Sequence, residues 1–251
     1  IFGTICITLL MIVMALPLGV CAAIYMVEYA GNSGLARVIR ASVNNLAGVP
    51  SIVFGLFGVG FFILFIGRSI DRVRGGGLLF GQPAMLWAAA TLAVLVLPVI
   101  IVNTAEALTA VPRSHREASF ALGATRWQTV SRVVLPQARA GILTGSILSI
   151  SRGAGETAPI LFTGCAYFLP RLPIVHLGVP FTGLSVPMVN PLDQFMELSY
   201  HIFIMATQST DAAATRPIQY GTTLVLVALT FLLNLAAISL RVRYRRGLES
   251  R

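Results

Sequence analysis

The sequence predicts an all-α integral membrane protein, a polytopic bundle of five membrane-spanning helices in a single transmembrane domain over residues 1–251. Two observations support this fold class. Hydrophobic residues make up 56% of the chain and charged residues only 11%, whereas soluble domains carry about 25% charged residues. The long apolar runs also lack the polar and apolar alternation of membrane β-strands, so helices are the structure that fits them.

The predicted spans are apolar stretches that contain almost no charged residue and that reach the roughly 20 residues needed to cross the hydrocarbon core. They cover residues 1–27, 41–67, 83–105, 139–166 and 217–240. The fourth span is interrupted by Arg152 and Glu156.

The basic residues orient these spans in the membrane. Twelve of the 18 fall on one side, five fall on the other, and Arg152 lies inside a span. By the positive-inside rule the side with twelve is cytoplasmic. The C-terminus is then cytoplasmic and the first span begins outside, so a sixth helix is expected upstream of residue 1.

The composition also excludes several activities. All 18 basic residues are arginine, and a chain without lysine cannot form the P-loop of an ATPase. Cys6, Cys21 and Cys165 form no C-x-x-C pair and no histidine stands at metal-ligand spacing, so no metal site is expected, and no cofactor is expected in this chain. Topology accounts for the net charge of +9, so nucleic acid is not an expected partner.

The outer loop, residues 167–216, is too long for a simple connection. The loop carries five prolines, and its first half is expected to be irregular. In its second half, Asn190, Pro191 and Asp193 are typical of a helix start. An amphipathic helix over 192–206 is predicted to follow at the outer surface, either as a lid on the bundle or as a docking site for a partner.

The cytoplasmic loop, residues 106–138, contains two capping-box patterns, Ser114 with Glu117 and Thr125 with Gln128. Gly123 lies between them and is a natural helix stop. We therefore expect a short helix, a glycine corner, and a second helix that Pro136 bends as it enters the membrane.

One pattern in this loop resembles a known family. Glu117-Ala118-Ser119, followed at fixed spacing by Gly123 and by Leu135-Pro136, resembles the EAA loop of bacterial ABC importer permeases, with Ser119 in place of the motif's second alanine. The resemblance implies a bacterial plasma-membrane protein whose residues 114–123 form a coupling helix in a cleft of a separate ATPase. Alternatively, Glu117 would only stabilise the helix start, by about 1 kcal/mol.

Arg152 and Glu156 stand four residues apart and are predicted to share one face of a helix. A charge at mid-membrane costs roughly 2.5–3.5 kcal/mol, so such residues normally face the bundle interior. Gly145 and Ser149 continue the same face as a seam of small residues suited to close helix packing. The two charges either serve a substrate or form an internal ion pair that neutralises itself.

The segment from Ser151 to Pro159, SRGAGETAP, resembles a motif of the phosphate-specific permeases among ABC importers, those of the A type in the Pst system. Residues 24–30 and 49–57 add to this resemblance. It implies that Arg152, Glu156 and Thr157 line the substrate path, with the Arg152 guanidinium meeting the anion. The implied partners are a second phosphate permease subunit, a cytoplasmic ABC ATPase dimer that binds ATP and Mg²⁺, an extracytoplasmic phosphate-binding protein and membrane lipid.

Three alternatives remain open. The chain could serve another oxyanion, such as molybdate or sulfate. A gradient-driven secondary transporter is disfavoured because Glu156 is the one acid well inside a predicted span, whereas proton relays usually use several. A membrane-bound enzyme is disfavoured because His115, His176 and His201 lie apart.

Overall fold

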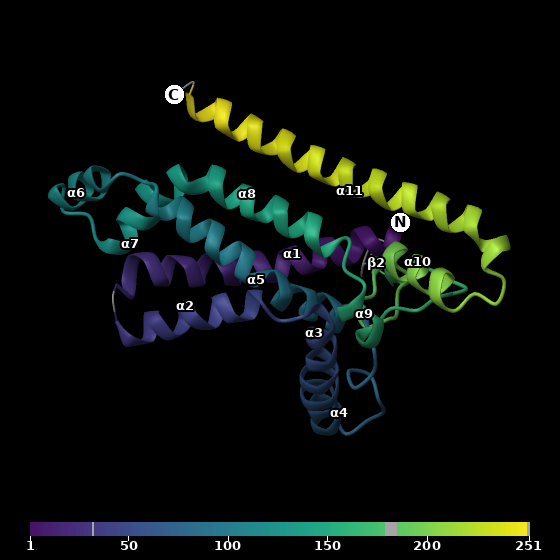
Figure 1. Ribbon diagram of the computed structural model, residues 1–251. Helices are drawn as coiled ribbons and strands as arrows, with labels where there is room; N and C mark the ends of the chain where they lie inside the picture. The colour runs from purple at the N-terminus through teal and green to yellow at the C-terminus, as the bar shows by residue number, and fades with distance from the viewer. Residues whose placement is uncertain (32, 179–184, 250–251) are drawn as a thin grey trace. The chain divides into compact units, whose positions relative to one another are not determined.

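The computed structural model describes residues 1–31, 33–178 and 185–249. The chain divides into two compact units. Unit 1 comprises 1–11, 50–94 and 153–230, and unit 2 comprises 12–49, 95–152 and 231–251. In chain order the elements are α1 (Phe2–Ile24), η1 (Tyr25–Tyr29), α2 (Gly34–Ala47), α3 (Ser51–Phe57), η2 (Gly58–Gly67), α4 (Arg68–Arg74), α5 (Met85–Thr109), α6 (Arg113–Ala121), α7 (Arg126–Thr129), η3 (Val130–Val134), α8 (Leu135–Gly153), α9 (Ala158–Thr163), β1 (Ile174–Gly178), β2 (Ser185–Val189), α10 (Leu198–Thr207) and α11 (Ala212–Glu249) (Figure 1).

Within the described residues, five helices are long and apolar enough to cross a membrane. They run over Phe2–Tyr29, Ser51–Arg74, Met85–Thr109, Arg126–Gly153 and Ala213–Ser239. The predicted fold class, an all-α polytopic membrane bundle, is confirmed.

The second span differs from its predicted range of 41–67. Residues 41–47 belong to α2, which ends before Gly48, and α3 begins only at Ser51. Pro50 accounts for the break, because proline disfavours helical backbone in the residue before it and is tolerated at a helix start. An amphipathic helix, α2, therefore precedes the span, and the span itself continues to Arg74.

In unit 1, α3 packs against α9 at a glycine. A side chain at Gly55 would meet the backbone of Ala158 and Pro159, so the two helices approach closely only because this position carries none. The amino end of α5 lies in the same unit. There the Trp87 ring N–H donates to the Phe80 carbonyl at 2.7 Å.

The predicted outer loop, which belongs to unit 1, differs from the prediction in both halves. Strands β1 and β2 pair antiparallel, with Ile174 opposite Val189, where irregular backbone was predicted. The helix predicted to begin at Asn190 begins instead at Leu198. The reason is long-range pairing: the carbonyls of Pro191 and Asp193 accept the backbone N–H groups of Leu86 and Met85 at 2.7 and 2.9 Å. This pairing holds the segment extended and satisfies orphan donors at the start of α5.

In unit 2, α5 and α8 approach closely where α8 carries glycine. A side chain at Gly141 would meet Ala107, and one at Gly145 would meet Asn103. Ser149 is fully buried on the same helix. The predicted close packing of this small-residue seam is therefore confirmed, with α5 as the partner of Gly145.

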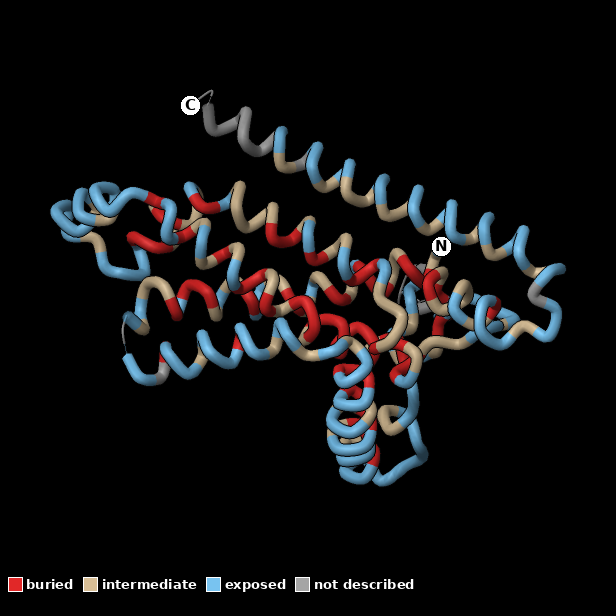
Figure 2. The backbone as a smooth tube through the Cα atoms, in the orientation of Figure 1, coloured by how far each residue is buried: buried red, intermediate tan, exposed pale blue. Residues whose placement is uncertain are grey.

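The spanning helices differ in how much of their surface this chain covers. In the apolar window of α5, 72% of the residues are buried, whereas in that of α11 the share is 0% (Figure 2). An apolar helix that its own chain leaves uncovered needs lipid or another subunit against it.

Candidate functional site

The first part of the candidate site is the exposed loop between α5 and α8, in which α6 and α7 lie beyond the ends of these two helices (Figure 1). No residue of α6 is buried. Three large apolar side chains in the loop are exposed, namely Phe120 at 46%, Leu122 at 90% and Trp127 at 61%. Exposed apolar side chains gathered on one short segment are typical of a protein interaction site.

The corner after α6 has the backbone that its sequence predicts. Gly123 has φ of 81°, in the left-handed region that favours glycine. Thr125 and Gln128 form a complete capping box. In it the Thr125 N–H donates to Gln128 Oε1 at 2.8 Å, and the Gln128 N–H donates to Thr125 Oγ1 at 3.3 Å. Both predictions are confirmed.

The other predicted capping box, Ser114 with Glu117, is wrong. α6 begins at Arg113, with Pro112 as N-cap and no side chain capping the helix. Proline disfavours helical backbone at Val111. The Pro112 carbonyl accepts the His115 N–H at 3.3 Å, which places Ser114 inside the first turn. Glu117 is exposed and does not stabilise the helix start through this box.

An ion pair that the sequence did not reveal anchors the base of α6. Arg116 Nη2 lies 2.8 Å from Glu28 Oε1 of η1, with side chains only 16% and 13% exposed. The same guanidinium donates to the carbonyls of Leu108 and Val111 at 2.7 and 2.6 Å. Glu28 belongs to the 24–30 segment that carried part of the resemblance, but 88 residues separate the partners, and no local pattern joins them.

The remaining residues of the EAA-like pattern connect α6 to the membrane helix. Ser119 Oγ lies 2.9 Å from Thr129 Oγ1, so this small residue joins α6 to α7. A π-helical stretch, η3, separates α7 from α8 just before Pro136. Because Pro136 carries no N–H, the carbonyl four residues earlier has no α-helical partner, which fits an irregular helix at the predicted bend.

The second part of the candidate site is the SRGAGETAP segment, and here one prediction is wrong. α8 ends at Gly153 and α9 begins at Ala158, so Glu156 lies outside any helix and does not share a helical face with Arg152. The predicted span of 139–166 is thus interrupted by a break at 154–157. Two glycines flank Ala154 and favour an end to the helix, and Pro159 then suits the first turn of α9.

The structure places the predicted substrate-path residues in this region with different exposures. Arg152 is exposed on the last turn of α8, while Glu156 and Thr157 are half-buried. Thr157 is the N-cap residue of α9. The Glu156 carbonyl lies 3.3 Å from Ser199 Oγ of α10.

Glu197 is a buried carboxyl beside this break that the sequence analysis missed. It is 2% exposed, and its Oε2 accepts the Ser199 hydroxyl at 2.7 Å. Its Oε1 is buried and has no hydrogen-bond partner in the described part of the chain. Burial raises the pKa of Glu197 to about 8, against the opposing effect of the Ser199 hydrogen bond. The signal that could have found it is an acid inside the apolar run FMELSYHIFIM.

These features define a class of protein: a helical membrane protein with an exposed segment typical of an interaction site, and with charged residues at a break between two helices. The sequence profile described as "Binding-protein-dependent transport system inner membrane component" matches residues 15–249. The chain therefore belongs to this family, which confirms the resemblance seen in its sequence.

Individual relatives agree with this placement. The chain is 35% identical over 241 residues to the probable ABC transporter permease protein YqgI of Bacillus subtilis, covering 94% of this chain and 74% of the relative. It is 36% identical over 230 residues to the phosphate transport system permease protein PstA 1 of Mycobacterium tuberculosis, covering 91% of this chain and 65% of the relative. It spans 59% of the length of a further Bacillus subtilis relative, YqgH, at 35% identity.

The fold is also found among solved structures. A structure of the MetNI methionine ABC transporter in an inward-facing conformation matches with a TM-score of 0.64 and 20% identity, over 96% of this chain and 91% of that one. At this identity the match supports the fold alone.

Proposed function

We propose that this chain is a permease subunit of an ATP-driven inorganic phosphate importer and forms the translocation path together with a second permease. The observation that supports phosphate as the substrate is the similarity to a phosphate transport system permease over 91% of the chain. The chain acts as a transporter subunit, and ATP hydrolysis belongs to a partner ATPase that binds ATP and Mg²⁺. An extracytoplasmic phosphate-binding protein delivers the substrate.

The exposed loop supports the coupling part of this proposal. Glu117, Ala118, Ser119 and Gly123 lie on or just after a helix with no buried residue, and Phe120, Leu122 and Trp127 give the same loop an apolar surface. A short helix with small residues fits a cleft, and apolar side chains around it stabilise docking. Leu135 and Pro136 begin α8 directly after this loop, so a displacement of α6 can be passed along the chain to a membrane-spanning helix.

The broken helix supports the substrate part. Arg152 ends α8 at the break, and the planar guanidinium suits a multivalent oxyanion. Glu156 and Thr157 lie within the break itself, where irregular backbone is tolerated in a membrane protein only beside a cavity or other protein. Arg152 therefore meets the anion, and Glu156 positions it or controls its passage.

Transport by the reconstituted complex tests the function. Vesicles that contain both permeases, the ATPase and the binding protein are expected to take up labelled phosphate only when ATP is supplied. Excess molybdate or sulfate should not compete with it. Uptake driven by an ion gradient without ATP would reject the proposal, and competition by molybdate or sulfate would reassign the substrate.

Substitution of the charged residues tests the substrate path. Arg152→Gln combined with Glu156→Gln should assemble and yet lose phosphate uptake, because no guanidinium then meets the anion. Arg152→Lys should also be impaired, since it keeps the charge but loses the planar fork. Arg139→Gln, on the exposed surface of the same helix, is the matched control. Full uptake by the double variant would remove both residues from the substrate path.

The proposed location is the bacterial plasma membrane, with the C-terminus in the cytoplasm. In a background without the native cysteines, Gly76→Cys should react with an impermeant thiol reagent added outside intact cells, and Arg245→Cys should not. The opposite labelling pattern would invert the assigned sides.

A further inference from the structure

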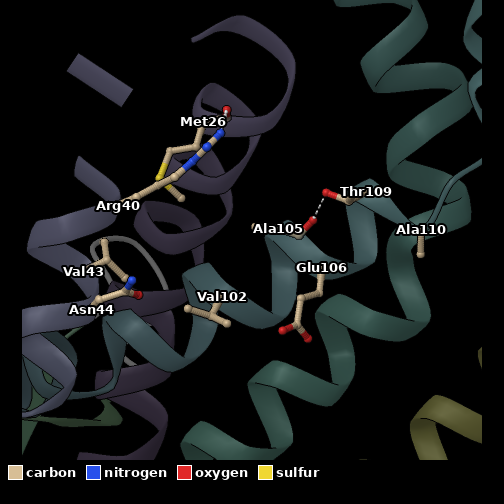
Figure 3. Close-up of a pocket in the computed structure, with 9 residues that line it drawn as sticks. All are labelled: Met26, Arg40, Val43, Asn44, Val102, Ala105, Glu106, Thr109 and Ala110. Atoms are coloured by element: carbon tan, nitrogen blue, oxygen red, sulfur yellow. Dashed lines mark hydrogen bonds between the residues drawn. The ribbon is translucent and has the colours of Figure 1, made fainter. Parts of the chain in front are cut away.

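Two adjoining pockets in unit 2, here called the inner groove, are not used by the proposed transport mechanism. The larger, about 510 Å³, lies between η1 and α2 on one side and α5 on the other, and it is lined by Met26, Arg40, Val43, Asn44, Val102, Ala105, Glu106, Thr109 and Ala110 (Figure 3). The smaller, about 340 Å³, is lined by Val27, Glu28, Arg40, Thr109, Arg113 and Arg116. Arg40 and Thr109 line both pockets.

The two pockets differ in chemistry. Five of the nine residues around the larger one carry apolar side chains, whereas three of the six around the smaller one are arginines. An apolar trough thus leads directly into a basic pocket. Arg40 and Arg113 belong to the side that the positive-inside rule assigns to the cytoplasm.

The carboxylates nearby do not neutralise this basic pocket. Glu28 is paired with Arg116, whose guanidinium also serves two carbonyls. The Glu106 side chain points away from the Arg40 guanidinium (Figure 3). The positive charge that remains in the basic pocket therefore comes from Arg40 and Arg113.

The guanidinium groups of Arg40 and Arg113 have N–H donors that are available to a ligand. Arg40 makes only long contacts, at 3.4 Å to the Met26 carbonyl and 3.5 Å to the Gly31 carbonyl. In the part of the chain that the structure describes, no hydrogen bond or ion pair involves the Arg113 side chain. Guanidinium groups bind phosphate through paired N–H donors, and basic pockets between membrane helices on the cytoplasmic side suit anionic head groups.

We propose that the inner groove binds an anionic phospholipid of the cytoplasmic leaflet. Arg40 and Arg113 hold its phosphodiester, and an acyl chain lies along Met26, Val43, Val102 and Ala105. The adjoining apolar trough favours a lipid over free inorganic phosphate, because inorganic phosphate has no apolar group to bury there. This inference rests on the proposed orientation of the chain and not on its substrate.

Lipid retention by the whole importer complex tests the site without turnover, so a wrong substrate assignment leaves this test unaffected. The complex is purified in mild detergent, stripped of lipid, and incubated with mixed micelles that contain phosphatidylglycerol or phosphatidylcholine. Bound lipid is counted by native mass spectrometry. The wild-type complex should retain phosphatidylglycerol in preference to phosphatidylcholine.

Two variants address the two halves of the groove. Arg40→Gln with Arg113→Gln should weaken phosphatidylglycerol binding about tenfold or more. Ala105→Phe keeps both arginines but fills the trough, and it should weaken binding as well. The matched control, Arg132→Gln with Arg139→Gln, removes two exposed arginines outside the groove and should bind as the wild type does.

Other results would overturn the proposal. Equal loss in the control would mean that the lipid responds only to net charge. Labelled inorganic phosphate bound through Arg40 and Arg113, and unaffected by Ala105→Phe, would assign the pocket to the free anion. Loss of the second permease from the groove variants, with lipid retention unchanged, would make the groove a subunit interface.

Discussion

The loop between α5 and α8, which is the predicted inner loop, and the loop between α9 and α11, which is the predicted outer loop, are held in different ways. In the inner loop, α6 has no buried residue, and its corner and the start of α7 are stabilised by bonds between neighbours in the sequence. In the outer loop, Phe195 and Glu197 are almost fully buried, and backbone groups bond to residues about a hundred positions away. The glycine corner and the start of α7 thus depend on local backbone preferences, whereas the buried loop depends on the partners that its backbone groups find.

The largest expected effect comes from the buried carboxyl of the outer loop. A pKa of about 8 in place of the ordinary value of 4.5 means that the folded state binds the Glu197 proton more tightly than the unfolded state does. Its contribution to stability is complete below the unfolded pKa and is lost as the pH rises through 8. Between about pH 5 and pH 8 the loss is about 3 kcal/mol.

Glu197→Gln should abolish this pH dependence, because glutamine cannot titrate. The thermal unfolding midpoint of the detergent-solubilised complex, measured across the same pH range, checks it. Asp193→Asn, at an exposed position of the same loop, should keep the wild-type slope. An unchanged slope in Glu197→Gln would mean that Glu197 does not hold its proton in the fold.

Arg116→Gln is expected to have the next largest effect, since it leaves the largely buried Glu28 carboxylate unpaired. We expect destabilisation of about 2 kcal/mol, less than for a fully buried pair because both side chains keep some exposure. Loss of ATPase coupling should accompany it, because Arg116 fixes the base of α6. The unfolding midpoint and transport-stimulated ATP hydrolysis measure the two effects, with Arg126→Gln as an exposed control in the same loop. Wild-type values for both would show that the ion pair does not anchor α6.

Gly123→Val tests whether the shape of the inner loop matters for coupling. Gly123 has φ of 81°, and a β-branched residue in this left-handed region costs about 1–2 kcal/mol. The corner should therefore distort, and the ATPase should detach or hydrolyse ATP without transport. Gly75→Val is a matched control, because Gly75 has φ of 68° and equally open surroundings but lies outside the inner loop. Copurification of the ATPase measures the outcome. Equal retention of the ATPase by both variants would mean that coupling does not need the glycine corner.

The smallest expected effect is that of Thr125→Ala, which removes the side-chain half of the capping box at α7. A lost N-cap costs about 1 kcal/mol, and the effect should stay local because the capping box joins residues only three positions apart. Amide hydrogen exchange at 126–129 should accelerate while exchange in α5 stays unchanged. Faster exchange in α5 would mean that the capping box at Thr125 also stabilises structure outside this loop.

The sequence by itself determined the membrane class, five spanning helices, the glycine corner at Gly123 and the capping box at Thr125. These features depend on apolar runs, on backbone preference and on residues three or four positions apart, all of which can be read locally. The small-residue seam at Gly145 was predictable for the same reason, although its partner α5 was not.

Only the tertiary structure decided where α10 begins and which partner Arg116 takes. Asn190 and Pro191 carry a valid helix-start signal, but the carbonyls of Pro191 and Asp193 serve the unsatisfied N–H groups of α5 instead. Such bonds join groups far apart in the chain, and their free energy outweighs a local preference of about 1 kcal/mol. Glu28 and Arg116, 88 residues apart, show the same dependence on the assembled fold.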